Sequence, residues 1–480
     1  MQRFLIQEAA KHVGEKVKVA GWVNVRRAHG KIIFIDLRDK SGVLQCVFVP
    51  SNKDAYEAVN DVRTEWVVEL TGQIVKRPEN MVNKNIETGS VELSVEELKV
   101  LSKAETLPFD VTTDGREINE EIRMKYRYLD LRRERMRNNL IVRHKVVKFV
   151  RDFLSAEGFT EIETPMLTKS TPEGSRDFVV PSRLQPGKFY ALPQSPQQYK
   201  QLFMVAGLEK YFQIARALRD EDVRGDRQFE HTQIDMELSF VEQEDVMDLN
   251  ERMIIAIVKT LFPQKKIQEI PFPRMSYQEA MKKYNSDKPD IRKDKNDPNL
   301  LAFCWIVDFP FFEKDEETGK WTFTHNPFSA PKPEFMKDLL AQKNIENILT
   351  TQYDIALNGV EMCGGSIRNH TPEALEAVFS IMGYKKEEIQ EKFGHMLKAF
   401  SFGAPPHGGI AYGLDRFLSI LLNESSIREV IAFPKTGDGR DLMMDAPSEI
   451  YPKQLKELHI KIDIEKPIKE KKVIKKKAKK

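Results

Sequence analysis

The sequence lacks the long hydrophobic runs of membrane proteins, and it is poor in cysteine. No stretch of about 18 consecutive apolar residues occurs, so we expect no membrane-spanning helix. The segment MQRFLIQEAAKHVGEKV has no apolar core of the signal-peptide kind. Only three cysteines occur, at Cys46, Cys304 and Cys363, and none forms a C-x-x-C pair. This usage speaks against a disulfide framework or a zinc site and predicts a cytoplasmic protein.

Two common nucleotide-binding signatures are also missing. The sequence contains neither G-x-x-x-x-G-K-[ST] nor a G-x-G-x-x-G that follows a strand-like run. Any nucleotide is therefore held in neither the P-loop nor the Rossmann manner. With 480 residues, 41% of them hydrophobic and 31% charged, the chain is expected to be soluble and to form two or three domains.

The net charge of +2 hides a strong local excess of lysine. Residues 466–480 contain nine lysines and one glutamate, which leaves about −6 on the rest of the chain. We expect residues 461–480 to form a disordered, lysine-rich tail. Such a tail either keeps the protein soluble or binds polyanions such as RNA, and the sequence leaves both readings open.

The N-terminal part, residues 1–103, reads as a small β domain. Five strand-like runs lie between residues 15 and 101, and a short helical stretch separates the third from the fourth. This order is typical of an OB-fold barrel, which often binds single-stranded nucleic acid through strands one to three. Arg26, Arg27, Phe34 and Gln45 fall on those strands. The alternatives are a barrel that binds protein or sugar, or Phe34 as a residue of the barrel core.

A hinge is expected over residues 104–137, where charged residues are dense. A helix then follows over about 139–157, since apolar residues recur there at helical spacing, and Gly158 ends it. The remainder, residues 138–460, mixes strands and helices in one large domain.

The stretch RALRDEDVRGDRQFEHTQIDMELSF, residues 216–240, alternates like a strand in its second half. One face carries Thr232, Ile234, Met236, Leu238 and Phe240, and the other carries His231, Gln233, Asp235, Glu237 and Ser239. A loop over 222–230 would return this strand antiparallel to the preceding one and bring Arg219 and Glu221 beside the polar face. That face is either solvated or built for a polar ligand.

Two further stretches favour a ligand. GGIAYGLDRFLSILL (408–422) reads as a glycine-rich strand that enters a helix, with Arg416 near the junction and suited to bind a phosphate. YDIALNGVEMCGGSIR (353–368) reads as a strand pair with Asp354 and Glu361. Carboxylates beside phosphate-binding arginines indicate Mg²⁺.

Together these stretches resemble the class II aminoacyl-tRNA synthetases, and most closely the bacterial-type aspartyl-tRNA synthetases. GFTEIETPMLTKSTPEGSRDF resembles motif 1, LRDE motif 2 and GLDR motif 3; QSPQQYKQ, THNPFS and GGSIR resemble signatures of the aspartate subgroup. The resemblance extends from GWVNVRR to IAFPKTGDGRDLMMDAPS. It implies an α+β protein, with an N-terminal OB-fold that binds the anticodon and a catalytic domain built on an antiparallel sheet flanked by helices.

The resemblance also implies site residues, a homodimer and the substrates L-aspartate, ATP and tRNA(Asp). The catalytic residues would be Arg219, Glu221 and Arg416. Aspartate would be bound by Glu173, Ser195, Gln197, Lys200, Arg219, Asp235, His325 and Arg368. ATP would be bound by Arg219, Asp220, Glu221, Gln228, His231, Glu361, Gly413, Leu414, Asp415 and Arg416. Mg²⁺ would be held by Asp354 and Glu361, and the dimer interface would include Pro165.

The reaction implied is ATP-dependent formation of aspartyl-adenylate and its transfer to the 3′ end of tRNA. Lys200 and Arg368 would clasp the side-chain carboxylate, and two cations in one desolvated pocket would select an acid over asparagine or lysine. Arg219, Arg416 and Mg²⁺ would position the reactants and neutralise charge, without a protein nucleophile.

The chain departs from the family at three places. The large insertion of bacterial members is reduced here to a short loop near 293–301. His231 stands where phenylalanine usually stacks on adenine, so we expect weaker or pH-sensitive ATP binding, or a contribution from Phe229. Cys363 replaces a usual glycine and is interpreted as a tolerated small residue.

For the anticodon, the resemblance assigns Arg27, His29, Phe34, Gln45 and Met81. Histidine at position 29 is common in enzymes that charge both tRNA(Asp) and tRNA(Asn), whereas strict enzymes often have leucine there. We therefore favour a non-discriminating enzyme; the alternative is that His29 is a polar turn residue. Two other hypotheses are a synthetase-derived binding protein that does not charge tRNA and a synthetase-like enzyme that makes free asparagine.

Overall fold

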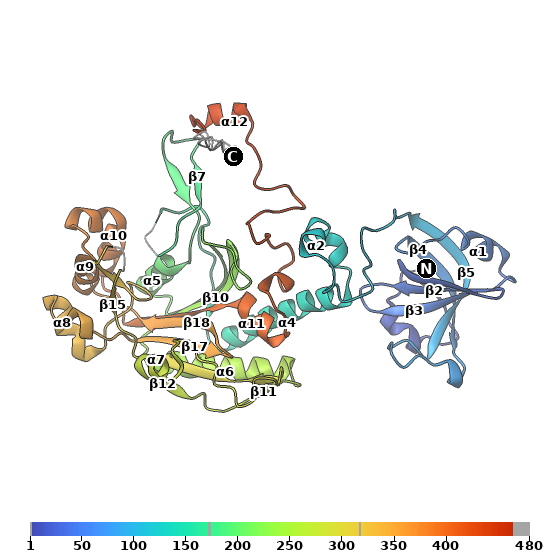
Figure 1. Ribbon diagram of the computed structural model, residues 1–480, viewed down its shortest axis with the longest axis horizontal. Helices are drawn as coiled ribbons and strands as arrows, with labels where there is room; N and C mark the ends of the chain where they lie inside the picture. Colours follow the sequence, from blue (N-terminus) through green and yellow to red (C-terminus); the bar gives the residue numbers. More distant parts are fainter. Residues whose placement is uncertain (1, 171–173, 316–317, 464–480) are drawn as a thin grey trace, which may run out of the picture. The chain divides into compact units, whose positions relative to one another are not determined.

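The computed structural model describes residues 2–170, 174–315 and 318–463 (Figure 1). The chain divides into two compact units, Met1–Ile118 and Asn119–Lys480. Glu173 and nearly all of the lysine-rich tail predicted at 461–480 lie outside the described residues. Among the residues described, no helix is both long and apolar enough to span a bilayer.

The first unit is a closed five-stranded barrel, as the sequence predicts. Its strands follow the order β1-β2-β3-β5-β4, and β1 also pairs with β4 to close it. A short helix separates the third strand from the fourth. The bounds are β1 Lys16–His29, β2 Ile32–Arg38, β3 Val43–Phe48, α1 Lys53–Ala58, β4 Val67–Lys76 and β5 Val91–Ser102.

Alternation along β2 decides which side chains fill the barrel. Ile33, Ile35 and Leu37 are buried in its core, whereas Phe34 and Asp36 on the opposite face are only partly buried. The interpretation of Phe34 as a core residue is therefore wrong. His29 is exposed and is the last residue of β1, next to the turn at Gly30.

The second unit is built on an eight-stranded sheet in the order β12-β14-β17-β18-β19-β10-β9-β6. All neighbouring pairs are antiparallel except the two at the edges, β12 with β14 and β6 with β9. The bounds are β6 Thr160–Glu161, β9 Lys210–Leu218, β10 Glu230–Ser239, β12 Arg274–Ser276, β14 Phe303–Val307, β17 Gln352–Leu357, β18 Val360–Ile367 and β19 His407–Gly413.

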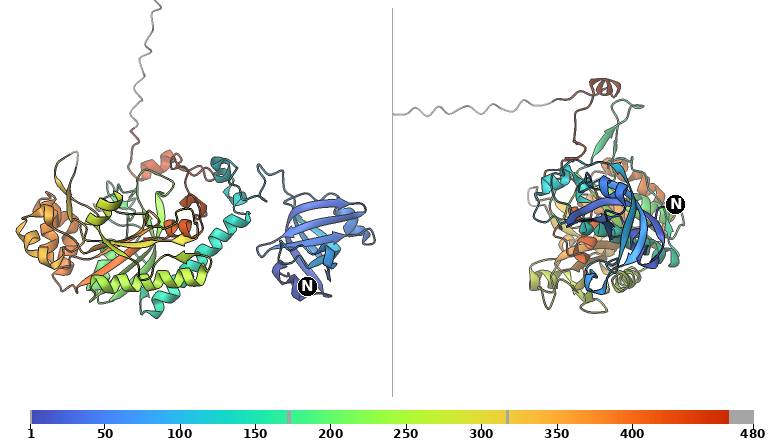
Figure 2. Two further views of the ribbon diagram at one scale, coloured as in Figure 1. Left: turned by 60° about the horizontal axis from the view of Figure 1, so that its bottom comes forward. Right: turned by 90° about the vertical axis from the view of Figure 1, so that its right-hand side faces the viewer.

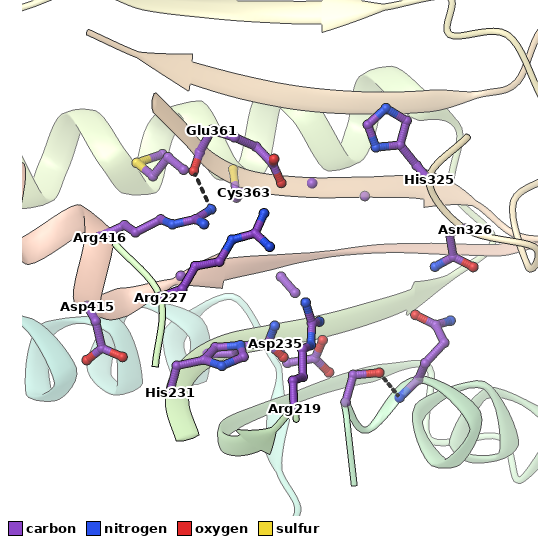
Figure 3. Close-up of a pocket in the computed structure, with 18 of the residues that line it drawn as sticks. Arg219, Arg227, His231, Asp235, His325, Asn326, Glu361, Cys363, Asp415 and Arg416 are labelled. Atoms are coloured by element: carbon purple, nitrogen blue, oxygen red, sulfur yellow. Dashed lines mark hydrogen bonds between the residues drawn. The ribbon is translucent and has the colours of Figure 1, made fainter. Parts of the chain in front are cut away.

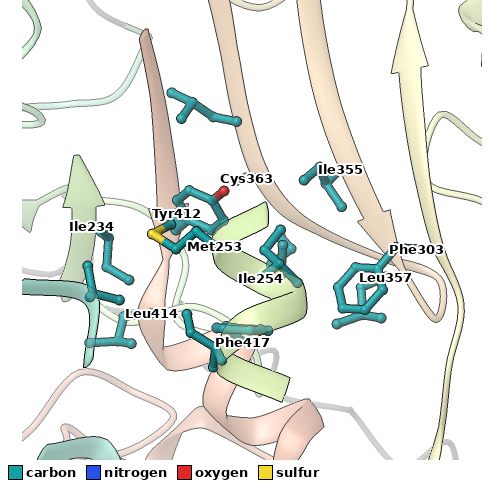
Figure 4. Packing of buried hydrophobic residues seen from close by; sticks show 14 of the residues in the cluster. Ile234, Met253, Ile254, Phe303, Ile355, Leu357, Cys363, Tyr412, Leu414 and Phe417 are labelled. Carbon is teal, nitrogen blue, oxygen red and sulfur yellow. The ribbon is translucent and has the colours of Figure 1, made fainter. Parts of the chain in front are cut away.

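Helices α4 (Glu134–Ala156) and α6 (Gln243–Leu261) lie along one face of this sheet (Figures 1 and 2). On α6, Val246, Met253 and Ile257 recur at helical spacing and are buried, which is why this helix packs on the strands. Figure 4 shows Met253 and Ile254 of α6 against Ile234, Ile355 and Tyr412 of the sheet, with Leu414 and Phe417 closing the core.

The remaining helices lie around the sheet. Helices α8, α9 and α10 gather at one end of it (Figure 1). The bounds are α2 Glu120–Lys125, α3 Arg127–Asp130, α5 Gln197–Val205, α7 Tyr277–Tyr284, α8 Met336–Ala341, α9 Pro372–Ile381, α10 Lys386–Phe400, α11 Leu414–Leu421 and α12 Pro452–Glu457. Short strand pairs are β7 Val179–Pro181 with β8 Phe189–Ala191, β11 Lys266–Ile267 with β13 Leu300–Leu301, and β15 Phe312–Lys314 with β16 Trp321–Phe323.

Residues 119–137 belong to the second unit, although the sequence predicts a hinge there. The reason is a buried ion cluster around Asp130, whose carboxylate accepts hydrogen bonds from Arg123, Arg127 and Arg133. Arg123 also donates to Glu429, at 2.7 Å. Arginines that look solvated in the sequence are thus paired and buried, and they hold this segment to the rest of the second unit.

Between α7 and β13 the chain passes through residues 285–299 without a helix or a strand. Three contacts secure this short connection. The Lys265 ammonium donates to the Pro298 carbonyl at 2.7 Å and to Asn423, and Lys293 N donates to the Gln268 side chain. The short loop predicted near 293–301 is therefore a fixed connection to the end of α11.

Candidate functional site

A polar cavity of about 330 Å³ opens on the face of the sheet opposite α4 and α6. Strands β10, β18 and β19, helices α5 and α11, and the loop that follows β9 supply its walls (Figure 3). The predicted residues that line it are Ser195, Gln197, Lys200, Arg219, Glu221, Gln228, His231, Asp235, His325, Glu361, Arg368, Gly413, Asp415 and Arg416. One cavity thus gathers side chains from segments that lie more than 200 residues apart.

The predicted hairpin is present, and its polar face forms the floor of the cavity. β9 and β10 pair antiparallel. Ile234, Met236 and Leu238 point into the core, whereas Gln233 and Asp235 line the cavity. The prediction for Phe240 is wrong, because the strand ends at Ser239 and Phe240 has a left-handed backbone with its side chain exposed. The two-residue period therefore holds only within the paired strand.

Four buried charges stand at one end of the cavity. Lys200 Nζ lies 2.7 Å from Asp235 Oδ1 and 3.2 Å from Glu237 Oε2. Arg368 donates to both carboxylate oxygens of Glu237, at 2.9 and 3.2 Å, and to the Ser366 hydroxyl. Two cations thus face two carboxylates, so the expected excess of positive charge is absent.

The two carboxylates respond differently to burial. Burial raises the pKa of Asp235, and attraction to Lys200 only partly offsets this effect. For Glu237 burial also favours the neutral acid, but the charges of Arg368 and Lys200 outweigh it and lower the pKa to about 2. Glu237 is therefore a fixed anion that orients Arg368, and Asp235 is the carboxylate with remaining capacity for a ligand.

Two buried oxygens at the cavity accept no hydrogen bond from the part of the chain that the structure describes. They are Asp235 Oδ2 and Gln233 Oε1. Both belong to cavity-lining residues on the same face of β10. Because an unsatisfied buried acceptor costs about 1–3 kcal/mol, these oxygens point to a ligand that carries hydrogen-bond donors, such as an ammonium group.

Glycine at position 409 leaves space for neighbouring atoms of the protein. A Cβ atom there would lie about 2 Å from the Glu237 carboxylate and from the Met236 carbonyl. The absence of a side chain therefore makes room for a buried carboxylate of the protein, not for a ligand. At Gly413, by contrast, the nearest heavy atoms to such a Cβ are 3.7 Å away or more, and this glycine does line the cavity.

Three arginines reach into the other end of the cavity, and Figure 3 shows Arg219, Arg227 and Arg416 around the same space. Arg219 Nε donates to the Gln194 carbonyl at 3.3 Å, and Arg227 pairs with Glu221 at 3.1 Å. Arg416 contacts Asp226, at 3.2 Å from its carboxylate. Such a cluster of guanidinium groups fits the oxygens of a polyphosphate.

Asp354 and Glu361 lie on the paired strands β17 and β18, which the Asn358–Gly359 turn joins. Glu361 lines the cavity; Asp354 lies behind it, accepts from Gln352 at 2.7 Å and is almost fully buried. Burial and repulsion from Glu361 raise the pKa of Asp354 well above its usual value. A hard cation would relieve this repulsion, so the donor set fits Mg²⁺ held by two carboxylates and phosphate oxygens.

His231 lines the cavity next to the arginines. Burial and repulsion from Arg219 and Arg416 lower the pKa of this imidazole to about 3. The imidazole is therefore neutral at physiological pH, which speaks against the expected pH sensitivity of ATP binding. Phe229 cannot replace it, because its ring packs against Phe178, with the centroids 5.4 Å apart, and against Gly439.

Several residues predicted to bind ATP make contacts with other parts of the protein. Leu414 is fully buried in the hydrophobic core (Figure 4). The Asp415 carboxylate accepts from Arg143 and from Thr232 N, so it supports the cavity wall. Asp220 lies outside the cavity lining, near Arg176. The Gln228 side-chain amide donates a hydrogen bond to the Arg227 carbonyl and accepts one from Lys435 N. The side chains of Asp415 and Gln228 thus line the cavity while they also hydrogen-bond to other parts of the protein.

The sequence interpretation missed other residues of this site. Those that line the cavity include Asp226, Arg227, Asn326 and Gln352. Strand periodicity placed Gln233 and Glu237 on the polar face of β10 with Asp235, but neither was assigned a role in the site. Arg143, which lies on α4 far from any motif, has no comparable signal.

The outer face of the barrel carries the other predicted surface. Arg27 pairs with Asp36 at 2.7 Å, and Gln45 donates to Glu92 at 2.8 Å. Glu92 in turn lies 3.7 Å from Arg77. Phe34 lies between these polar pairs in the sheet, opposite Arg27 and Val47, and Met81 is exposed. A partly exposed aromatic among arginines, carboxylates and an amide suits a stacked, hydrogen-bonded base.

Pro165 is exposed, in an apolar run with Met166 and Leu167. This run follows β6, the strand at the edge of the eight-stranded sheet. An edge strand with exposed apolar residues beside it is a surface that suits association.

Two family models match the chain. Residues 119–437 match the model of class II tRNA synthetases (D, K and N), and residues 17–101 match an OB-fold nucleic-acid-binding domain. The first match alone covers more than half of the chain. The division between the matches falls where the two structural units meet.

The chain is also similar to curated proteins over nearly all of its length. It is 43% identical to an aspartate–tRNA(Asp/Asn) ligase of Caldanaerobacter subterraneus subsp. tengcongensis, over 95% of this chain and 97% of that one. A ligase of the same name from Dictyoglomus turgidum is 42% identical, over 94% and 96%. Since 95% of 480 residues is about 456, about 120 of the 579 aligned positions have no residue in this chain, in keeping with the expected loss of an insertion.

Solved structures share the fold. An asparaginyl-tRNA synthetase from Pyrococcus horikoshii, complexed with asparaginyl-adenylate, matches with a TM-score of 0.73 at 21% identity, over 94% of this chain and 100% of that chain. An aspartyl-tRNA synthetase from Entamoeba histolytica matches with a TM-score of 0.71 at 20% identity, over 90% and 91%.

Proposed function

The chain belongs to the class II tRNA synthetases, among the aspartate–tRNA ligases, and from this premise we propose how its cavity activates aspartate and which tRNAs it charges. The function is ATP-dependent ligation of L-aspartate to tRNA. The relatives' name, aspartate–tRNA(Asp/Asn) ligase, is carried over here as a proposal that both tRNA(Asp) and tRNA(Asn) are charged.

One observation carries the proposal for the cavity. Buried N–H donors of Lys200 and Arg368 stand at one end, orphan acceptors of Gln233 and Asp235 lie on the floor, and arginines stand at the other end. This order matches the side-chain carboxylate, the ammonium group and the reacting carboxylate of aspartate, followed by the phosphates of ATP. An amino acid that lacks any of these groups would leave buried partners unsatisfied.

The amino-acid selectivity rests on donor geometry rather than on net charge. The ammonium of Lys200 and the guanidinium of Arg368 carry only N–H donors. Their positive charges are already balanced by Asp235 and Glu237. A carboxylate accepts from both residues. The amide N–H₂ of asparagine would face donors without an acceptor, which is costly in a buried site.

In the first reaction step the aspartate α-carboxylate attacks the α-phosphorus of ATP. A bond forms between carboxylate oxygen and phosphorus, the bond to the bridging oxygen breaks, and pyrophosphate leaves with the electron pair. Arg219 is placed to stabilise charge at the α-phosphate, and Arg416 to hold the terminal phosphate. In the second step a ribose hydroxyl of the terminal tRNA nucleotide attacks the carbonyl carbon and releases AMP.

Asp354 and Glu361 would hold Mg²⁺ in this site. The ion would supply charge neutralisation of the phosphate oxygens. The protein contributes the pair of carboxylates and excludes water from Asp354, which is 4% exposed.

The proposed tRNA range is tested by charging separate transcripts of tRNA(Asp) and tRNA(Asn) with radiolabelled aspartate. We expect both to be aspartylated. Exposed His29 at the end of β1 supports this proposal, as does the name of the relatives. Charging of tRNA(Asp) alone would retain the ligase and refute the role assigned to His29.

Replacing Phe34 with alanine should weaken tRNA charging and leave adenylate formation unchanged. Stacking of one base contributes about 1–3 kcal/mol, so KM for tRNA should rise about 5-fold to 100-fold. The measurement is aminoacylation beside ATP–pyrophosphate exchange without tRNA. Val47→Ala, which removes a partly buried neighbour paired with Phe34, serves as the control. A parallel loss of exchange would show that the barrel face has no separate role.

Replacing His231 with phenylalanine should lower KM for ATP about 3-fold to 10-fold, since a larger ring offers more stacking area for adenine. For the wild type, KM for ATP should show no titration by His231 between about pH 6 and pH 8.5, because the pKa of the imidazole is about 3. Pyrophosphate exchange at varied ATP concentration and pH measures both. A histidine-like titration that disappears in His231→Phe would contradict the neutral ring.

The proposed assembly is a homodimer in the cytoplasm. The exposed run from Pro165 to Leu167 beside edge strand β6 supports the dimer, and three buried cysteines suit a reducing compartment. Light scattering of the purified chain distinguishes a dimer from a monomer.

A further inference from the structure

A line of buried hydrogen bonds leads from the cavity into the interior of the catalytic unit. Gln197 Nε2 donates to Gln201 Oε1 at 3.0 Å, and Gln201 Nε2 lies 3.2 Å from His407 Nε2. His407 Nδ1 lies 2.8 Å from the Pro405 carbonyl. Gln201 and His407 are fully buried, and only Gln197 lines the cavity.

The polarity of this line is fixed from its inner end. A carbonyl oxygen only accepts, so His407 Nδ1 must carry a proton and donate to Pro405. Burial lowers the pKa of His407, so the ring is neutral and Nε2 is an acceptor. Gln201 must then donate from its amide nitrogen to the ring, which turns its oxygen toward Gln197.

The same reasoning sets the orientation of Gln197. The Gln201 oxygen can only accept, so Gln197 must offer it the amide nitrogen. The carbonyl oxygen of Gln197 is therefore the end of the amide left for the cavity. It joins Asp235 Oδ2 and Gln233 Oε1, two further acceptors among the cavity-lining residues.

We propose that Gln201 and His407 are positioning residues that hold the Gln197 amide with its oxygen toward the α-ammonium group of bound aspartate. This inference rests on the proposed function of the cavity. Neither residue touches the substrate. Without them the amide can rotate and present N–H groups to an ammonium group, which would replace an attraction by a repulsion.

The test uses Gln201→Met, which keeps side-chain length and removes the acceptor for Gln197. KM for aspartate in pyrophosphate exchange should rise about 10-fold to 100-fold, the effect of losing a hydrogen bond to a charged group. KM for ATP should stay within about 2-fold. Succinate, which is aspartate without the ammonium group, should inhibit the variant and the wild type with the same Ki, within about 2-fold.

The matched control is Gln198→Met. Gln198 is the neighbouring buried glutamine on α5, and it also pairs with a histidine, His395, at 2.7 Å, but it lies outside the lining of the aspartate cavity. This variant should keep both KM values and the Ki. If Gln201→Met does not fold, His407→Leu tests the same hydrogen bonds, because it removes the imidazole acceptor. This variant should also raise KM for aspartate and leave the Ki of succinate unchanged.

Equal increases in KM for aspartate and in Ki for succinate would overturn the inference, because they would indicate general damage to the cavity. An unchanged KM for aspartate would overturn it as well. A wild-type protein without aspartate-dependent exchange would instead refute the proposed function, so the two failures are distinguishable.

Discussion

Replacing Arg219 with alanine is expected to reduce aspartate-dependent ATP–pyrophosphate exchange about a thousandfold. This arginine reaches the cavity between the acceptors of β10 and the polyphosphate end, and its Nε is held by the Gln194 carbonyl at 3.3 Å. A fixed guanidinium at the α-phosphate stabilises charge that develops only in the transition state, so kcat should fall more than KM rises.

Two variants separate this role from a general effect of removing charge. Arg219→Lys keeps the charge but loses the planar fork, so it should recover only part of the rate. Arg216→Ala removes an exposed arginine that pairs with Glu230 on the same hairpin and lies outside the cavity lining, and it should keep near-normal exchange. An Arg219→Ala variant with more than about a tenth of wild-type activity would contradict the assignment.

Replacing Arg368 with glutamine is expected to abolish aspartate activation and to lower the free energy of unfolding by about 3–5 kcal/mol. The fully buried Glu237 carboxylate would lose both of its bonds to the guanidinium and would keep only Lys200. The donors for the substrate carboxylate would be lost at the same time. Urea denaturation measures the first effect and pyrophosphate exchange measures the second.

The double variant Glu237→Gln with Arg368→Gln separates folding from function. It removes one charge of each sign, so no buried charge is left without a partner and most of the lost stability should return. Aspartate activation should stay abolished, because the donor end of the cavity is still missing. Recovery of activity in the double variant would refute the role of Arg368 in substrate binding.

A third variant sets the scale for these effects. Arg252→Gln breaks an ion pair with Glu157 in which the arginine side chain is more than half exposed. It should change the free energy of unfolding by less than about 1 kcal/mol. A comparable loss in Arg252→Gln and Arg368→Gln would show that burial of the charges around Arg368 has no special importance.

Strand periodicity predicted the floor of this site because side chains alternate strictly along a paired strand. Gln233 and Asp235 face the cavity, and Ile234 and Met236 fill the core, as the alternation requires. Arg416 was equally predictable, since a strand that enters a helix places the first helical turn beside the sheet. The five-stranded barrel followed from the order of its runs.

The resemblance to family motifs assigned more side chains to ATP binding than the structure directs into the cavity. Within GLDR, the Leu414 side chain lies in the core, and the Asp415 carboxylate, although it lines the cavity, accepts a hydrogen bond from Arg143. Arg416 extends its guanidinium into the cavity (Figure 3). Of the hinge predicted at 104–137, residues 119–137 belong to the second unit. The arginines of this segment look solvated in the sequence, but their partners Asp130 and Glu429 are buried, and Glu429 lies about 300 residues away.

The charge balance at the substrate end of the cavity also could not be predicted from any single segment of the sequence. The sequence suggested two unpaired cations, yet Glu237 on β10 meets Arg368 only because β18 and β10 both flank β19. The pairing of distant strands thus changes the explanation of selectivity from an excess of charge to an arrangement of donors.

The most direct test of the account is amino-acid-dependent ATP–pyrophosphate exchange by the purified full chain, with aspartate, asparagine, glutamate and lysine in parallel. The account predicts exchange with aspartate and at least about a hundredfold less with asparagine, because the donors of Lys200 and Arg368 have no acceptor in its amide nitrogen. A folded protein that shows no exchange with aspartate, or equal exchange with asparagine, would contradict it.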